Sequence, residues 1–205
     1  MALSFNDDIS AYKCKTFQQH LQIEKFYFQS FQHIDYSVYK QERIRHLKNI
    51  NENHLLNPLI DYLYYHQPKI AVFPGSFNPF HKGHYNILLK AEKIFDKVII
   101  AFGENPDKNP RIFPIPYTIQ NRQIEHYSSL LTDFLKKLNY PVTVIRGLRN
   151  STDFHYEQNQ YRYMQELYPD IKIINIFCDK IYEHISSSGI RTLQKYNQHH
   201  SYLLP

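Results

Sequence analysis

The chain changes character at Lys69. Beyond this residue, short apolar runs at 70–73 and 98–102 flank a segment, 87–95, whose apolar residues fall on one face of a helix. A buried strand, a covering helix and a second buried strand are typical of a βαβ unit with parallel strands. The pattern therefore predicts that residues 69–205 form an α/β fold.

A second unit of the same kind follows. An apolar run at 142–145 leads to a turn at Gly147 and then to a helix, for which Ser151 or Thr152 is the expected N-cap. Asp153 falls in the first turn of this helix, where the helix dipole favours a negative charge. These signals predict another strand that leads directly into a helix.

The rest of the chain continues this alternation. Pro169 stops the second helix, 171–177 forms another buried apolar run, and the serines at 186–188 open a closing helix. Short buried strands that alternate with amphipathic helices predict a Rossmann-like, doubly wound parallel sheet of the α/β class.

Three loops are expected to lie close together in such a sheet. They are residues 74–84, 146–153 and 182–188. Ligands of open parallel sheets bind beyond the carboxyl ends of the strands, at the point where the strand order reverses. We therefore expect the functional site where these loops converge.

Residues 1–68 have a different pattern. They are rich in Tyr, Gln, His, Lys and Asn, contain no glycine, and place apolar residues at loosely helical spacing, as between Leu55 and Leu63. This pattern predicts a helical N-terminal extension, 1–68, ahead of a single domain, 69–205.

Length and composition favour one globular core. A chain of 205 residues with 42% hydrophobic content can bury one well-packed domain and an appendage. Cys14 and Cys178 lie far apart and lack the spacing of a disulfide framework or a zinc site. Residues 1–10 do not resemble a secretory leader, and no apolar run approaches the roughly 18 residues of a membrane span. We therefore expect a cytoplasmic protein that contacts no membrane.

The charge is mildly basic. A net charge of +5 and a pI near 9.0 suit a pocket that binds several phosphates, and they also suit nucleic acid. Lys and Arg are scattered along the chain, and neither an RNA-binding aromatic signature nor zinc-finger spacing is present. We therefore expect no nucleic-acid partner.

The loop 74–84 carries the strongest chemical signal. It follows a buried strand and opens a helix, where backbone amides and the helix dipole can hold phosphate. Gly75 allows a sharp turn beside a ligand, and Gly83 removes a side chain between His81 and His84. Both imidazoles are expected to donate to α-phosphate oxygens as charge builds in a transition state. The alternative is that the two histidines only cap the helix.

This loop, PGSFNPFHKGH, resembles the (T/S)FxPxHxGH signature of the HxGH nucleotidyltransferase superfamily. Residues 144–157 (VIRGLRNSTDFHYE) resemble the IRGLRxxxDFxYE stretch of bacterial phosphopantetheine adenylyltransferases, and 185–188 resemble their ISSS motif. Residues 105–108 (NPDK) resemble the SPxK segment that carries their catalytic lysine. With four motifs in order, the chain is identified as similar to this family over 69–205, which implies a nucleotidyltransferase domain of the adenylyltransferase type.

The resemblance implies roles for individual residues. His84 would stabilise the transition state, and Lys108 and Arg149 would be the further catalytic residues. The implied contacts to the nucleotide are Gly75, Ser76, Phe77, His81, Gly83, His84, Gly147, Leu148, Arg149, Glu157, Tyr182, Ile185, Ser186, Ser187 and Ser188.

A second set of residues would bind the acceptor. Lys108 and Arg146 would hold its phosphate, and Ser76 would be shared between the two substrates. The segment 129–131 resembles the part of the family that lines the pantetheine arm, with Leu131 as the implied contact.

The reaction implied by the resemblance moves AMP from ATP to 4'-phosphopantetheine, forming dephospho-CoA and pyrophosphate in coenzyme A biosynthesis. A phosphate acceptor is already ionised near pH 7 and needs no general base. Because two polyanions meet, Lys108, Arg146, Arg149 and a Mg²⁺ carried on the ATP phosphates would offset their repulsion. ATP and Mg²⁺ are therefore expected, and no side chain is expected to ligate the metal.

Departures from the family pattern leave alternatives open. Asn78 stands where the family usually has Asp, and the segment 109–141 departs from the family's acceptor region. A second hypothesis is therefore an HxGH enzyme that acts on nicotinamide mononucleotide or an alcohol phosphate. A third is a nucleotide-binding regulatory protein with little turnover. Because the family commonly forms hexamers, a homo-oligomer is expected, and residues 1–68 could block or replace the contacts that form it.

Overall fold

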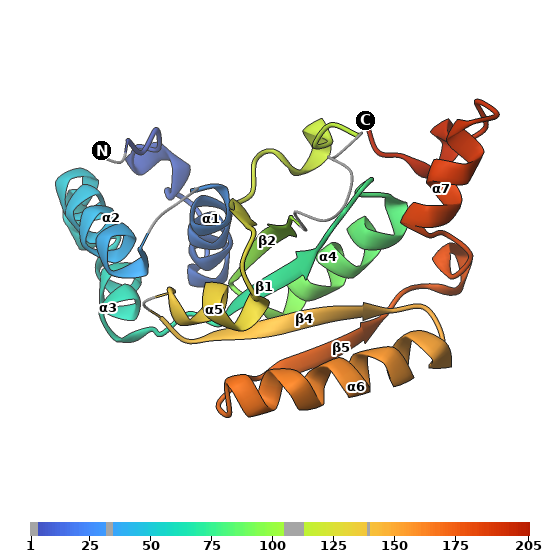
Figure 1. Ribbon diagram of the computed structural model, residues 1–205. Helices are drawn as coiled ribbons and strands as arrows, with labels where there is room; N and C mark the ends of the chain where they lie inside the picture. The colour runs from blue at the N-terminus through green and yellow to red at the C-terminus, as the bar shows by residue number, and fades with distance from the viewer. Residues whose placement is uncertain (1–3, 32–34, 105–112, 139) are drawn as a thin grey trace.

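A parallel sheet lies at the centre of the molecule. The computed structural model describes residues 4–31, 35–104, 113–138 and 140–205. Within them, five parallel strands form one sheet in the order β3-β2-β1-β4-β5 (Figure 1). The strands are β1 (Ile70–Gly75), β2 (Lys97–Gly103), β3 (Ile124–Tyr127), β4 (Val142–Leu148) and β5 (Ile173–Phe177). The strand order reverses between β1 and β4, which is the switch point of the sheet.

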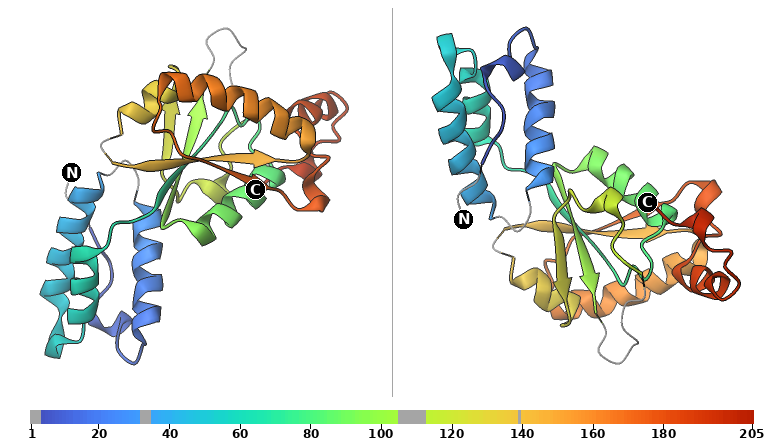
Figure 2. Two further views of the ribbon diagram at one scale, coloured as in Figure 1. Left: turned by 90° about the horizontal axis from the view of Figure 1, so that it is seen from below. Right: turned by 90° about the horizontal axis from the view of Figure 1, so that it is seen from above.

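Helices cover both faces of this sheet. Figure 2 shows α4 (Lys82–Ile94) on one face and α6 (Ser151–Leu167) on the other. The short helix α5 (Leu131–Lys136) lies on the α6 side, because its buried residues share an apolar cluster with Val72 and Val144. This arrangement confirms the predicted doubly wound α/β fold. The remaining helices of the described chain are α1 (Phe17–Ser30), α2 (Tyr36–Ile50), α3 (Asn57–Tyr65) and α7 (Ser187–Gln194), with short 3₁₀ helices at Ile9–Ala11, Glu52–His54, Tyr117–Ile119, Lys180–Tyr182 and His200–Tyr202.

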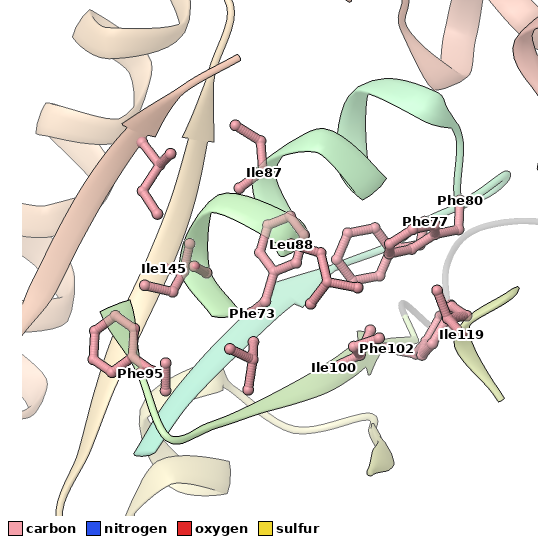
Figure 3. Packing of buried hydrophobic residues seen from close by; sticks show 14 of the residues in the cluster. Phe73, Phe77, Phe80, Ile87, Leu88, Phe95, Ile100, Phe102, Ile119 and Ile145 are labelled. Atoms are coloured by element: carbon pink, nitrogen blue, oxygen red, sulfur yellow. The ribbon is translucent and has the colours of Figure 1, made fainter. Parts of the chain in front are cut away.

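The core on the α4 face fixes the position of the first loop. Ile87 and Leu88 of α4 pack over Phe73, Ile100 and Ile145 of the sheet, and all of these side chains are at most 3% exposed (Figure 3). Burial of one such side chain contributes roughly 1.5–3 kcal/mol. The helical face expected from the sequence is therefore the buried face, and it holds the start of α4 against the end of β1.

The strand β3 is not predicted by the sequence pattern. It has only four residues, Ile124–Tyr127, and it lies at the edge of the sheet, where it pairs with β2 alone. Glu125 and His126 are polar, so the segment lacks the apolar run that marks the inner strands. Only its register against β2 identifies it.

The N-cap predicted for α6 is wrong by one or two residues. Asn150, not Ser151 or Thr152, has the extended backbone of a cap, and its side chain accepts the backbone N–H of Asp153. Asn is as good a cap as Ser, so the residue whose geometry precedes the helix takes the role. The expected acidic residue in the first turn, Asp153, is confirmed.

The N-terminal helices form a separate layer with its own core. Figure 1 shows α1, α2 and α3 side by side at one end of the molecule. Their division from the sheet at residue 68 stays a prediction. The buried residues of this separate apolar cluster are Ile9, Tyr12, Ile44, Leu47, Leu56, Leu59, Ile60 and Leu63.

Arg43 is the buried polar centre of this layer. Its side chain is fully buried and donates to both carboxylate oxygens of Asp7 at 2.8 Å. It also donates to Glu24 through Nε, at 2.9 and 3.0 Å, and to the hydroxyl of Tyr12 at 2.5 Å. All three guanidinium nitrogens are therefore satisfied within the extension.

Lys97 joins this layer to the sheet. It is the first residue of β2, is 2% exposed, and donates to the backbone carbonyls of Phe28 at 2.8 Å and Phe31 at 2.5 Å. Burial lowers the pKa of Lys97 to about 7, and the charge of Glu125 partly opposes that shift. Because Phe28 and Tyr39 also join the apolar cluster under α5 and α6, the extension is packed against the sheet.

Candidate functional site

One cleft lies at the carboxyl ends of β1 and β4. It has a volume of about 580 Å³, and segments from all three expected loops line it. Its lining residues are Ser76, His81, Gly83, His84, Ile87, Gly147, Leu148, Arg149, Thr152, Asp153, Tyr156, Glu157, Cys178, Ile185, Ser186, Ser187, Ser188 and Arg191. The predicted convergence of these loops at the switch point is therefore observed.

The loop after β1 folds back onto the core. Phe77 is 3% exposed and packs against Phe73 and Phe102, with a backbone φ of 43° that residues other than glycine rarely adopt. A Cβ at Gly75 would lie 2.7 Å from the Phe77 ring, so glycine is required there for space. Burial of Phe77 thus holds the turn that presents Ser76 to the cleft.

The two histidines stand in contact at the start of α4. Their ring centroids are 3.6 Å apart, and a Cβ at Gly83 would lie 3.1 Å from the His81 ring. His81 is the N-cap, because its Nδ1 accepts the backbone N–H groups of Gly83 at 3.1 Å and His84 at 3.4 Å. Nδ1 of His84 accepts the N–H of His81 at 3.3 Å. Both imidazoles thus cap helix α4, which is the role that the alternative interpretation of the sequence gave them. Both also line the cleft.

These contacts set the protonation of both rings. With Nδ1 accepting, the single proton of a neutral imidazole sits on Nε2, which remains as a hydrogen-bond donor. Burial, and then the charge of Arg149, lowers the pKa of His81 to about 4. Burial, followed by the charges of His81 and Arg149, lowers the pKa of His84 well below its usual range. Near pH 7 the cleft therefore holds two uncharged N–H donors.

The end of β4 and the turn that follows it carry two arginines beside the site. Arg149 forms a bidentate pair with Asp153, with Nε and Nη2 each 2.8 Å from one carboxylate oxygen. Arg146 donates through Nε to Glu157 at 2.5 Å. A Cβ at Gly147 would lie 3.0 Å from Ile87, so the absent side chain lets β4 approach α4 closely.

The N-terminus of α7 closes the cleft. Ser186 is the N-cap and accepts the N–H of Gly189 at 3.1 Å, so the serines open the helix as predicted. The Ser187 hydroxyl donates to the carbonyl of Pro79 at 3.0 Å, and Arg191 donates to the carbonyl of Asn78 at 2.6 Å. These bonds tie α7 to the loop that carries the histidines.

Several predicted residues lie outside the lining of the cleft. Gly75 and Phe77 support the loop from beneath, and Tyr182 packs in the apolar clusters beside it. Leu131 begins α5, and Arg146 lies behind Glu157. The predicted Lys108, with the segment 105–108, falls outside the residues that the structure describes.

Some lining residues were not predicted. Asp153 and Tyr156 fall in the stretch 144–157, where the helical spacing of Asp153 and Glu157 was an available signal. Arg191 lies four residues after Ser187, on the same face of α7, which was a similar signal. Cys178 carried no signal, because it enters the cleft only through the position of β5.

The fold and the cleft define an α/β protein with a cavity at the switch point of its sheet, lined by hydrogen-bond donors and arginines. A helix N-terminus, neutral N–H donors, Arg149 and Arg191 surround this cavity, and such groups are chemically suited to phosphate oxygens. Among the described residues, no group of three or more His, Cys, Asp and Glu could hold a metal ion. No helix of that part of the chain has the length and apolar character needed to cross a membrane.

Comparison with known proteins identifies the family. The cytidylyltransferase-like family model matches residues 72–193. A phosphopantetheine adenylyltransferase of Cytophaga hutchinsonii is 40% identical over 147 residues, covering 67% of this chain and 97% of that protein. One of Mycoplasma mycoides is 39% identical, covering 63% and 99%, and one of Dictyoglomus thermophilum is 36% identical, covering 62% and 82%. The chain is therefore a nucleotidyltransferase and belongs to the phosphopantetheine adenylyltransferase family, as its motifs predicted.

Proposed function

We propose that this protein transfers AMP from ATP to 4'-phosphopantetheine, releasing pyrophosphate and forming dephospho-CoA. The observation that carries the proposal is the 40% identity to a phosphopantetheine adenylyltransferase across 97% of that protein's length. The matched region includes the strand, loop and helix segments that surround the cleft. The activity would be a step of coenzyme A biosynthesis.

The nucleotide is proposed to occupy the cleft lined by the three loops. Its phosphates would meet the N-terminus of α7, where Ser186, Ser187 and Ser188 offer amides and hydroxyls. Arg149 would act on the α-phosphate region, together with the Nε2 donors of His81 and His84. The helix end supplies partial positive charge without a titrating group.

The acceptor is proposed to bind on the α5 side of the site. Arg146 would hold its phosphate, Leu131 would contact the pantetheine arm, and Ser76 would serve both substrates. Lys108 would be a second cation for the acceptor phosphate. Support comes from the position of Arg146 on β4, on the same face of the sheet as the residues packed around α5.

The proposed reaction needs positioned charge rather than a base. An acceptor phosphate oxygen forms a bond to the α-phosphorus of ATP, and the bond to the oxygen bridging to the β-phosphate breaks. Pyrophosphate leaves with that electron pair, and no proton must be removed from the acceptor. The neutral His84 can donate Nε2–H to an equatorial oxygen as its charge grows, without adding repulsion from a like charge near Arg149.

Mg²⁺ is proposed to arrive on the ATP phosphates, where it would offset negative charge during attack. The two carboxylates of the cleft, Asp153 and Glu157, are each engaged by an arginine, which fits a metal carried by the triphosphate. We also propose a cytoplasmic homo-oligomer that acts on small molecules and binds no nucleic acid.

An acceptor panel tests the proposal. Pyrophosphate release is measured with ATP or CTP and with 4'-phosphopantetheine, nicotinamide mononucleotide or glycerol 3-phosphate. The proposal expects turnover with ATP and 4'-phosphopantetheine only. Turnover with another acceptor instead would assign a different nucleotidyltransferase activity, and tight ATP binding without turnover on any acceptor would indicate a regulatory protein. Either outcome would overturn the proposal.

A further inference from the structure

A smaller cavity lies at the amino ends of β1 and β2, away from the cleft. It has a volume of about 230 Å³, and α1, α2 and α3 contribute to its walls together with Pro68 and Asp96. Its lining residues are Gln18, Leu21, Gln22, Glu24, Lys25, Phe28, Tyr36, Tyr39, Tyr62, Leu63, His66, Pro68 and Asp96. Figure 1 shows the three helices at the end of the molecule opposite α7. Since β1 spans six residues of roughly 3.3 Å each, this cavity and the cleft lie on the order of 20 Å apart and are separate sites.

Aromatic rings form much of the wall of this cavity. The ring of Phe28 lies 5.0 Å from that of Tyr39 and 5.3 Å from that of Tyr36, measured between centroids. Tyr62 and the buried Leu63 of α3 add further apolar surface. An apolar cavity of about 150 Å³ is large enough to bind benzene. The volume and the lining are therefore suited to a small molecule built on one aromatic ring.

The hydroxyl of Tyr39 is an unpaired donor in this wall. The residue is 2% exposed, and no group of the described chain forms a hydrogen bond with its hydroxyl. Other tyrosines of the extension are satisfied, since Tyr36 donates to the carbonyl of His66 at 3.1 Å and Tyr12 donates to Asp7. Burial raises the pKa of Tyr39 well above its usual range, so the hydroxyl keeps its proton. Because an unpaired buried donor is costly, an acceptor atom on a bound molecule would be favourable here.

The charged groups of the cavity already have partners. The carboxylate of Glu24 is paired with Arg43, and the ammonium of Lys25 donates to a backbone carbonyl of α4 at 2.6 Å. Asp96 accepts the backbone N–H of Lys69 at 2.8 Å. A charged ligand would have to displace one of these contacts or remain without a counter-charge in a partly buried site. The lining therefore favours an uncharged ligand.

We propose that this cavity is a binding site for a small, uncharged aromatic molecule that offers a hydrogen-bond acceptor, such as a carbonyl oxygen, to the hydroxyl of Tyr39. The ligand would lie between the helices of the extension and the residues that precede β1 and β2. Binding there favours the arrangement in which the extension is packed against the sheet, because only that arrangement forms the cavity. The site does not depend on the proposed function, so its test requires no turnover.

Titration of the full chain with benzamide and with toluene, followed by the backbone amide signals in NMR spectra, tests the site. The two probes share one ring, but only benzamide has a carbonyl acceptor. Both should cause saturable shifts around Leu21 and Leu63, with the lower dissociation constant for benzamide. Tyr39→Phe keeps the ring and removes the hydroxyl, so the affinity for benzamide should fall roughly two- to tenfold, as for one neutral hydrogen bond, while that for toluene stays unchanged. Without a probe, Tyr39→Phe should melt at the wild-type temperature or above it, because it loses an unpaired donor.

A pair of tryptophan variants on α1 supplies the second readout. Gln22 is exposed and lines the cavity, so Gln22→Trp should obstruct its opening and abolish the shifts caused by both probes. Phe26 is 64% exposed and lies outside the lining, so Phe26→Trp should bind both probes as the wild type does. The absence of saturable shifts around the cavity in the wild type would overturn the proposal. Equal affinities for the two probes, an equal loss of both in Tyr39→Phe, or undiminished binding in Gln22→Trp would also overturn it.

Discussion

Arg43 in the extension and Arg149 in the cleft show two uses of the same side chain. Arg43 is fully buried, and Asp7, Glu24 and Tyr12 accept hydrogen bonds from all three of its nitrogens. Arg149 has a side chain that is 36% exposed, and Asp153 is its only ion-pair partner in the described chain. The guanidinium of the extension is saturated by its own layer, whereas that of the cleft remains open to solvent and to a ligand.

The histidines of the cleft extend this contrast. Each uses Nδ1 on the backbone and keeps Nε2 as a donor, so part of its hydrogen-bonding capacity is left over. Buried polar groups without partners are costly, and folded proteins satisfy them internally. Hydrogen-bond donors that are left free beside a cavity therefore indicate a binding site. A buried network whose donors and acceptors are all paired, such as that of Arg43, indicates a structural role.

Removing Arg43 should give the largest effect on stability. Arg43→Ala leaves the buried carboxylates of Asp7 and Glu24 without a cation, and breaking such a network costs about 3–5 kcal/mol. Hydrogen exchange should show lost protection in α1 and α2, while turnover per folded molecule remains. Arg45→Ala on the same helix is the control, because Arg45 is 68% exposed and should change stability by at most about 0.5 kcal/mol. An equal loss of stability in Arg43→Ala and Arg45→Ala would show that the buried network around Arg43 does not stabilise the extension.

Removing His84 should give the largest effect on turnover. His84→Ala deletes a neutral N–H donor of the cleft and should lower kcat on the order of a hundredfold or more. Far-UV circular dichroism should show a folded protein, although the lost contact to the N–H of His81 weakens the helix cap. His155→Ala, which removes an exposed histidine of α6 outside the cleft, should leave kcat unchanged. Unchanged turnover in His84→Ala would show that its ring serves only the cap.

Much of the fold could be predicted because burial leaves a pattern. The inner strands β1, β2 and β4 carry continuous apolar runs, and α4 carries a clear apolar face. The edge strand β3 has no such run, since only its pairing with β2 makes it a strand. Strands and helices that pack in the core could therefore be predicted from the sequence. An edge strand that is defined only by its pairing with one other strand could not.

The site was predictable where one segment carries several functional groups. His81, His84 and the serines at 186–188 lie in short motifs, and the structure brings them to one cleft. Cys178 reaches the same cleft only because β5 ends beside β4. The pairing of Arg146 with Glu157 also depends on how α6 lies against the sheet. Such positions follow from tertiary packing, which sequence spacing does not record.

Acid should affect the two regions in different pH windows. The pKa of His81 is lowered from 6.5 to about 4 by burial and by Arg149, so the unfolded chain binds a proton more readily. Stability from His81 is therefore present above pH 6.5 and is lost as the pH falls toward 4. Burial raises the pKa of Asp7, but hydrogen bonds from Arg43 and Tyr12 outweigh it and hold the value near 2, so that contribution is lost only below about pH 4.

Urea unfolding at pH 7.5 and pH 5 checks this difference. Between these values, the wild-type free energy of unfolding should fall by about 1–3 kcal/mol through the histidine cap. His81→Asn keeps a good capping side chain that does not titrate, so its decrease should be smaller. Arg45→Ala should show the full wild-type decrease, because this exposed side chain of α2 contacts neither Asp7 nor His81. An identical decrease in wild type and His81→Asn would show that His81 does not set this acid sensitivity.

The smallest effects should come from matched helix caps in the two regions. Thr16 caps α1 by accepting the N–H of Gln19, and Ser186 caps α7 by accepting the N–H of Gly189. Replacing either cap by Ala costs about 1 kcal/mol of stability, so the melting temperatures of Thr16→Ala and Ser186→Ala should fall by similar amounts. Only Ser186→Ala should also raise the KM for ATP, several-fold, because the helix end that it orders opens onto the cleft. If Thr16→Ala raised the KM for ATP equally, the N-terminal extension would have to act on the nucleotide site. The Arg43 network of the extension, whose buried groups pair among themselves, could then no longer be contrasted with the cleft, whose donors are free for a ligand.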